Sequence, residues 1–104
     1  MEVVDHEPHF WFLLREDGSL FLDVACEHSA VSYNVLIQLN DEETARYSKY
    51  SRQYLSELAE SIHYSAPGVR GSTSLYKSRN VSSKYDAQVM AAVTAWRTAH
   101  SSDV

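Results

Sequence analysis

Histidine and cysteine side chains are the residues near the N-terminus with the most potential for chemistry. They occur in the stretches HEPH and CEH, which place His6 three residues before His9 and Cys26 two residues before His28. Imidazole and thiolate are ligands that zinc prefers, but these spacings match no zinc finger or zinc ribbon. We therefore predict no metal site and no cofactor, with the histidines at the surface and Cys26 in the core. Burial raises the pKa of a thiol, so a nucleophilic Cys26 is not expected either.

A second candidate for chemistry is the basic stretch SAPGVRGSTSLYKSRNVSS at 65–83, which contains no acidic residue. Glycine and serine backbones can present N–H groups to an anion, and arginine binds phosphate or carboxylate through two parallel hydrogen bonds. The stretch lacks the Gly-Lys-Ser/Thr ending of a phosphate loop, and a polar connection between two helices is the plainer interpretation. The alternative function is therefore an anion- or phosphate-binding domain, or a small enzyme, that uses the loop 68–84. Its anion-binding residues are Arg70, Lys77 and Arg79.

Asp23 is the one acidic residue inside a predicted strand, in the stretch LFLDVA. Apolar neighbours raise the pKa of a carboxyl group, and a perturbed pKa is one mark of a functional site. A charge that protects a strand from aggregation is the plainer interpretation. The sequence shows no paired carboxylates and no catalytic motif. Whether the protein is an enzyme therefore stays open, with a non-catalytic protein favoured.

The net charge of −5 is unevenly distributed along the chain. Residues 1–43 hold ten acidic side chains and one basic side chain, a balance of −9, whereas residues 44–104 hold four acidic and eight basic ones, a balance of +4. An acidic half repels nucleic acid at long range and attracts basic proteins. We therefore expect the partner to be another protein with a basic surface, and not nucleic acid.

The sequence predicts neither a signal peptide nor a membrane span. The stretch MEVVDHEPHF is acidic, and the longest apolar run, 10–14, is far shorter than the ~20 residues that cross a bilayer. A single cysteine cannot form an internal disulfide, which favours a reducing compartment. We therefore expect a soluble cytoplasmic protein. The length predicts one domain, 1–104, with disordered tails at 1–8 and 100–104.

A hairpin, FWFLLREDGSLFLDVA, is the first element that must position these side chains. A two-residue Asp-Gly turn pairs Glu16 with Ser19 and mixes polar and apolar residues on both faces. A three-residue Glu-Asp-Gly loop pairs Arg15 with Ser19, leaves Gly18 in a left-handed position and makes one face apolar throughout. We predict the second register. Its apolar face consists of Phe10, Phe12, Leu14, Leu20, Leu22 and Val24.

The rest of the chain predicts one more strand and two helices. The stretch VSYNVLIQL alternates apolar and polar residues over 31–39, as a strand does. After it, Asn40 and Glu43 form a capping box that starts a helix, and SAPGVRG ends that helix. A last helix covers 83–99, and a short fourth strand at 74–77 stays open. The fold class is therefore α+β, a three-stranded antiparallel meander followed by two α-helices packed on the sheet.

Apolar residues are left over on the outer face of the predicted sheet. We interpret them as a contact surface, because aromatic side chains surrounded by polar ones are typical of interface centres. The predicted function is a small non-catalytic protein-binding module, an adaptor or an inhibitor of the immunity-protein type, and a homodimer through the same face is a second option. The competing interpretation is that helix 83–99 covers this face. The predicted partner-binding residues are Trp11, Leu13, Phe21, Asp23 and Leu36.

Overall fold

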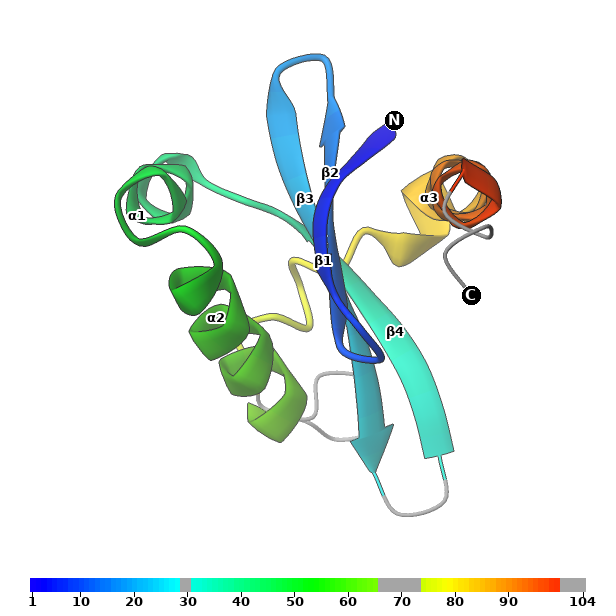
Figure 1. Ribbon diagram of the computed structural model, residues 1–104. Helices are drawn as coiled ribbons and strands as arrows, with labels where there is room; N and C mark the ends of the chain where they lie inside the picture. Colours follow the sequence, from blue (N-terminus) through cyan, green and yellow to red (C-terminus); the bar gives the residue numbers. More distant parts are fainter. Residues whose placement is uncertain (29–30, 66–73, 100–104) are drawn as a thin grey trace.

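A four-stranded antiparallel sheet forms the centre of the protein (Figure 1). The computed structural model describes residues 1–28, 31–65 and 74–99, so the predicted tail at 100–104 lies outside the described residues. The strands follow the chain in the order β1-β2-β3-β4. The predicted meander of three strands is present, and one further strand extends its edge. The strands are β1 (Glu2–Glu7), β2 (Trp11–Glu16), β3 (Ser19–His28) and β4 (Val31–Gln38).

Helices cover both faces of the sheet (Figure 1). Two of them, α1 and α2, lie on one face, and α3 lies alone on the other. The predicted α+β class is confirmed, in a helix–sheet–helix arrangement of layers. Within the described ranges, no helix is long and apolar enough to cross a membrane. The helices are α1 (Asp41–Tyr50), α2 (Arg52–Ser65) and α3 (Ser82–Ala99).

The hairpin of β2 and β3 closes with a two-residue turn, and our prediction of a three-residue loop was wrong. Asp17 (φ 49°) and Gly18 (φ 80°) both have a left-handed backbone, as a type I′ Asp-Gly turn requires. Glu16 therefore pairs with Ser19. The prediction failed because it assumed that one face of the sheet meets water. Helices cover both faces here, so neither face has to be uniformly apolar.

Each face of the sheet carries its own hydrophobic core. The smaller core lies under α3 and contains Leu14, Phe21 and Leu36 from the sheet and Ala92 and Val93 from the helix. Because a change of register by one residue moves a side chain to the other face, the six residues predicted to share one face are divided between the two cores. The buried residues of the larger core, under α2, are Trp11, Leu13, Leu22, Val24, Cys26, Val35, Ile37, Leu39, Leu55, Leu58, Ala59 and Ile62.

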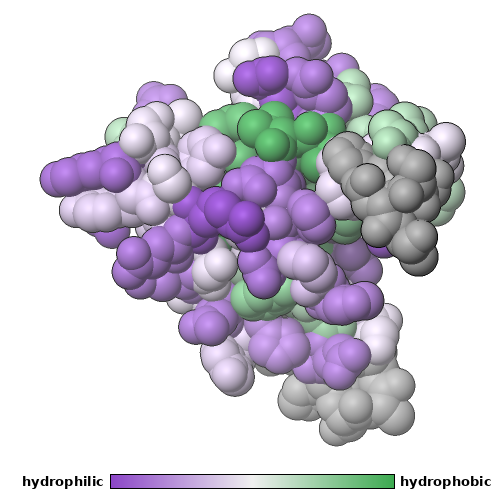
Figure 2. All heavy atoms as spheres, in the orientation of Figure 1, coloured by the Kyte–Doolittle hydropathy of each residue, from purple (hydrophilic) through white to green (hydrophobic). Residues whose placement is uncertain are grey.

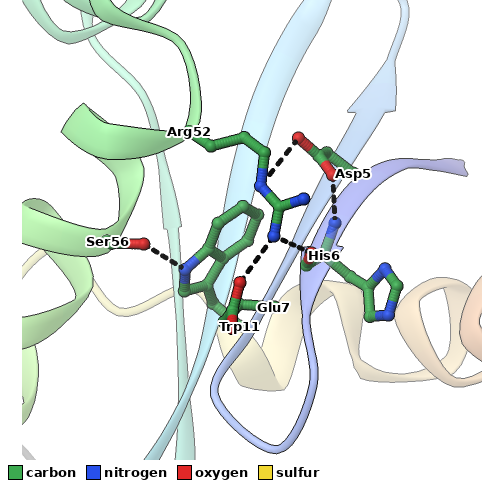
Figure 3. A network of polar contacts seen from close by, with 6 residues as sticks. All are labelled: Asp5, His6, Glu7, Trp11, Arg52 and Ser56. Carbon is green, nitrogen blue, oxygen red and sulfur yellow. Dashed lines mark hydrogen bonds and ion pairs between the residues drawn. The ribbon is translucent and has the colours of Figure 1, made fainter.

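Strand β1 forms from residues that we predicted to be a disordered tail, so that prediction was wrong. Arg52, at the start of α2, holds the outer edge of this strand (Figure 3). Its guanidinium donates to the backbone carbonyl of His6 at 2.9 Å and forms ion pairs with Asp5 and Glu7. It also lies 5.7 Å from the ring centre of Trp11. The sequence pattern could not show this anchor, because it joins positions 46 residues apart.

The predicted capping box at the start of α1 is confirmed. The Asn40 side chain accepts from the Glu43 N–H at 2.8 Å, and the Glu43 carboxylate accepts from the Asn40 N–H at 3.0 Å. The single helix predicted to follow it is broken in two at Ser51, which has a φ of 54° and a ψ of −137°. Because this backbone conformation cannot continue a helix, α1 and α2 run in different directions (Figure 1).

The segment before α3 covers the outer edge of β4. Residues 74–77 lie in a turn segment and form no strand, so the fourth strand considered there is absent. The Val81 N–H donates to the Leu36 carbonyl at 2.8 Å, and the Leu36 N–H donates to Oγ of Ser82 at 3.0 Å. The predicted helix 83–99 is confirmed to within one residue.

Candidate functional site

The five residues predicted to bind a partner do not form one exposed surface. Trp11 and Leu13 belong to the core under α2, whereas Phe21 and Leu36 belong to the core under α3. These four side chains are at most 2% exposed, and Asp23 is 8% exposed. As the competing interpretation expected, α3 packs on that face, and the register sends Trp11 and Leu13 to the other face. Part of the face stays uncovered, and a pocket forms there.

The pocket lies between α3 and the facing side of the sheet and has a volume of about 790 Å³. This volume is within the range of ~300–1,000 Å³ that is usual for ligand pockets. Three of the predicted residues, Trp11, Asp23 and Leu36, line the pocket, whereas Leu13 and Phe21 do not. Further lining residues are His6, Phe12, Asn34, Asp86, Trp96 and Arg97.

Asp23 is the buried acidic group of this pocket. Its carboxylate accepts from Nδ2 of Asn34 at 3.3 and 3.5 Å, and no basic side chain of the described residues lies within 4.0 Å of it. Burial raises the pKa of Asp23 to about 6; the hydrogen bond from Asn34 opposes this rise, and the carboxylate of Asp86 adds to it. A charge in such a place destabilises the folded chain, and groups of this kind cluster at functional sites.

Three rings from three elements form what we call the aromatic wall of the pocket: His6 from β1, Phe12 from β2 and Trp96 from α3. The Phe12 and Trp96 rings meet edge to face with centroids 5.6 Å apart, and His6 lies 4.3 Å from Trp96. The guanidinium of Arg97 lies 5.7 Å from the ring centre of Phe12. These contacts pack α3 on β1 and β2. They also place the rings of Phe12 and Trp96, a type of ring whose face attracts cations, at the pocket.

The charge balance of the pocket is negative. Its lining includes three carboxylates, those of Asp23, Glu27 and Asp86, and one guanidinium, that of Arg97. The lining therefore has a formal charge of −2 when Asp23 is ionised and the lining histidines are neutral. Because charges interact more strongly where water is partly excluded, this site attracts cations and repels phosphate.

Ser82 contributes a hydroxyl group to the lining of the pocket, and this group is hydrogen-bonded within the fold. It accepts from the Leu36 N–H at 3.0 Å and donates to Oδ1 of Asn80 at 2.5 Å. A nucleophilic serine needs a general base as its hydrogen-bond partner, and an amide oxygen is not one. Ser82 is therefore not placed to act as a nucleophile.

The three residues of the alternative anion site are not seen to converge, since Arg79 is engaged elsewhere and Arg70 lies outside the described residues. Arg79 donates to the two Glu43 oxygens at 2.9 and 2.6 Å and to the Gln38 carbonyl at 2.9 Å. Burial raises the pKa of Glu43, but the hydrogen bonds from Arg79 and the backbone outweigh this and lower it. Lys77 is exposed, and Arg70 lies outside the described residues. Arg79 therefore neutralises an internal carboxylate.

Cys26, His6 and His9 lie in different parts of the structure and form no common site. Cys26 is 1% exposed, which confirms its predicted place in the core, and burial together with the Asp23 carboxylate raises its pKa to about 11. His6 belongs to the aromatic wall, and His9 occupies the turn between β1 and β2 with a φ of 64°. In the parts of the chain that the structure describes, no three His, Cys, Asp or Glu side chains are placed to hold a metal ion.

Sequence reasoning named three lining residues of this pocket, Trp11, Asp23 and Leu36, and missed the rest. The clearest signal was Asp23, an isolated acid among apolar residues. Asp86, Trp96 and Arg97 stand far from it in the chain and meet it only because α3 packs on the sheet. Such long-range packing leaves no local pattern in the sequence.

Comparison with known proteins assigns no family to this chain. No family model, no curated protein and no solved structure matches it. The function therefore has to be inferred from the chemistry of the pocket itself.

Proposed function

We propose that this protein is a small, non-catalytic protein-binding module that captures a partner with a basic surface. The contact point is the pocket between α3 and the sheet. One observation carries the proposal: Asp23 lines this pocket, is 8% exposed and has no cationic partner among the described residues. A positively charged group of the partner supplies the missing counter-charge.

The distribution of charge along the chain supports a basic partner. The first 43 residues carry a balance of −9, and they make up the sheet and the first turn of α1. On the face that carries β1, hydrophilic side chains predominate, and apolar ones gather in smaller areas, the most prominent of them toward the upper centre (Figure 2). Long-range attraction between an acidic and a basic surface speeds encounter, as suits an adaptor or an inhibitor of the immunity-protein type.

We also propose that the protein acts as a soluble protein in the cytoplasm. Cys26 is a buried free thiol, and free thiols persist in a reducing compartment. Determining the cellular fraction that contains the protein tests this part of the proposal. Recovery from a membrane or extracellular fraction contradicts it.

Affinity capture with a matched pair of variants tests the binding function. Asp23→Asn and Asp17→Asn each remove one negative charge at nearly constant size, but Asp17 is exposed in the β2–β3 turn and does not line the pocket. Asparagine also suits a type I′ turn. Each chain is immobilised and exposed to the native lysate. We expect the wild type and Asp17→Asn to retain a basic protein that Asp23→Asn does not retain. Equal retention by all three chains, or by none, overturns the proposal.

A further inference from the structure

We infer that the pocket is a receptor for an arginine side chain of the partner, whose guanidinium pairs with Asp23 and stacks on the aromatic wall. The inference rests on the proposed function and names the group that enters the pocket. It follows from the hydrogen-bonding capacity of Asp23, from the rings beside it and from the charge balance of the lining.

The Asp23 carboxylate has capacity for a forked donor. A carboxylate offers about four acceptor positions on its two oxygens. Among the described residues, only the Asn34 amide hydrogen-bonds to this side chain, at 3.3 and 3.5 Å. A guanidinium presents two parallel N–H groups that match both oxygens of a carboxylate, which makes the pair stronger and more specific in direction.

The aromatic wall favours a flat cation over a compact one. Guanidinium groups stack on aromatic rings and are less strongly hydrated than ammonium groups, so they lose less when water is excluded. The chain itself contains this type of contact at the pocket, since the Arg97 guanidinium lies 5.7 Å from the ring centre of Phe12. An arginine of the partner therefore fits the chemistry of the site better than a lysine.

The formal charge of the pocket lining is negative enough to accept one additional cation. Asp86 on α3 and Glu27 on β3 add negative charge. Arg97 on α3 opposes a cation, as do His6 on β1 and His9 in the β1–β2 turn when they are protonated. Asn34 on β4 is neutral. With both imidazoles neutral and Asp23 ionised, one bound guanidinium changes the formal charge of the lining from −2 to −1, so the complex does not become positive.

Titration of defined peptides into the full chain, followed by NMR, tests the inference. The probe is a capped Gly-Arg-Gly tripeptide, and its matched control contains citrulline, which has nearly the shape of arginine without its charge. We expect saturable shifts of the Trp96 indole and Asn34 side-chain signals with the arginine probe, with a Kd on the order of 1 mM. We expect binding at least about tenfold weaker for the citrulline probe and for Asp23→Asn, while Asp17→Asn binds as the wild type does.

Lowering the pH provides a second readout on the same samples. Asp23 takes up a proton near pH 6, so binding of the arginine probe should weaken several-fold between about pH 7.5 and about pH 5. The backbone spectrum of each variant shows whether it remains folded, which separates loss of binding from loss of structure.

Several outcomes overturn the inference. Equal binding of the arginine and citrulline probes, or unchanged binding by Asp23→Asn, shows that charge pairing with Asp23 is not what the pocket recognises. Saturation by spermidine without saturation by the arginine probe assigns the pocket to small amines. Self-association that protects the same signals assigns it to a second copy of the chain.

The two proposals fail in different ways. If Asp23→Asn abolishes capture of a basic protein but the wild type does not bind the arginine probe, the proposed function is supported and the inference of an arginine receptor is wrong. If the arginine probe binds at Asp23 but no basic protein is captured through it, the pocket recognises arginine and the proposed function is wrong.

Discussion

Asp23 is a buried acidic residue that lowers the stability of the folded chain once it is ionised. Its carboxylate is 8% exposed and has a single amide partner among the described residues, so ionisation in the folded state is unfavourable. The pKa of an aspartate is 3.8 without such burial and about 6 here, so the folded chain holds this proton more tightly than the unfolded chain does. Stability therefore falls as the pH rises from about 4 to about 6 and stays constant with respect to this group above that range.

Asp23→Asn removes this dependence on pH. We expect the free energy of unfolding of the variant, relative to the wild type, to increase by about 2 kcal/mol between about pH 4 and about pH 7, because the pKa of Asp23 rises from 3.8 to about 6 on folding and a change of one pKa unit corresponds to about 1.4 kcal/mol. Urea unfolding at both pH values measures the difference. Asp17→Asn serves as the control and should show no such trend. A constant offset between Asp23→Asn and wild type at both pH values contradicts the prediction.

At the scale of elements, the break between α1 and α2 is a point of backbone strain. Ser51 has a φ of 54° and a ψ of −137°, a combination that glycine adopts readily and a residue with a Cβ does not. Its N–H donates to the Tyr47 carbonyl at 2.8 Å and closes α1. The break turns the chain so that Arg52, the first residue of α2, reaches β1 (Figure 3).

Ser51→Gly should stabilise the protein by about 1 kcal/mol, since it relieves the strain and keeps the N–H that closes α1. The serine side chain is exposed, so little packing is lost. Thermal unfolding measures the effect as a rise of several degrees in Tm. Ser51→Ala is the control: it keeps the Cβ, so no such rise is expected. A gain for alanine equal to the gain for glycine shows that backbone strain is not the cause.

At the scale of the whole molecule, the sheet is stable because both of its faces are covered. The core under α2 and the core under α3 share the same strands, and Leu14, Phe21 and Leu36 lose their cover if α3 is absent. The pocket exists because α3 covers only part of its face. Partial cover thus combines a stable sheet with an acidic pocket, which is the binding site that we propose.

A chain that ends at residue 80 tests this dependence, because it retains the sheet, α1 and α2 and lacks α3. We expect it to lose cooperative unfolding and to bind a dye for exposed apolar surface, since an open sheet face cannot stay dry. Circular dichroism during heating, together with dye fluorescence, measures both effects against the full chain. Cooperative unfolding at the midpoint of the full chain shows that α3 is not needed for the fold.

The sequence by itself determined the features that depend on local chemistry. Alternation over 31–39, the capping box at Asn40 and the start of the last helix were all predicted correctly, because caps and periodic patterns act over a few residues. The burial of Cys26 and the isolated position of Asp23 were also visible in the pattern.

Only the tertiary structure decided the register of the β2–β3 hairpin, the existence of β1 and the composition of the pocket. The two-residue Asp-Gly turn is compatible with the fold because helices cover both faces of the sheet, and the hairpin sequence alone does not show that cover. Strand β1 pairs with β2 and contacts Arg52 from a distant part of the chain, and the pocket includes residues of α3 that meet Asp23 only after folding. The free-energy difference between two turn types or two registers is small when only local interactions are counted. Burial of a whole sheet face contributes more free energy than this difference. Long-range packing therefore decides between alternatives that the local pattern leaves close in energy.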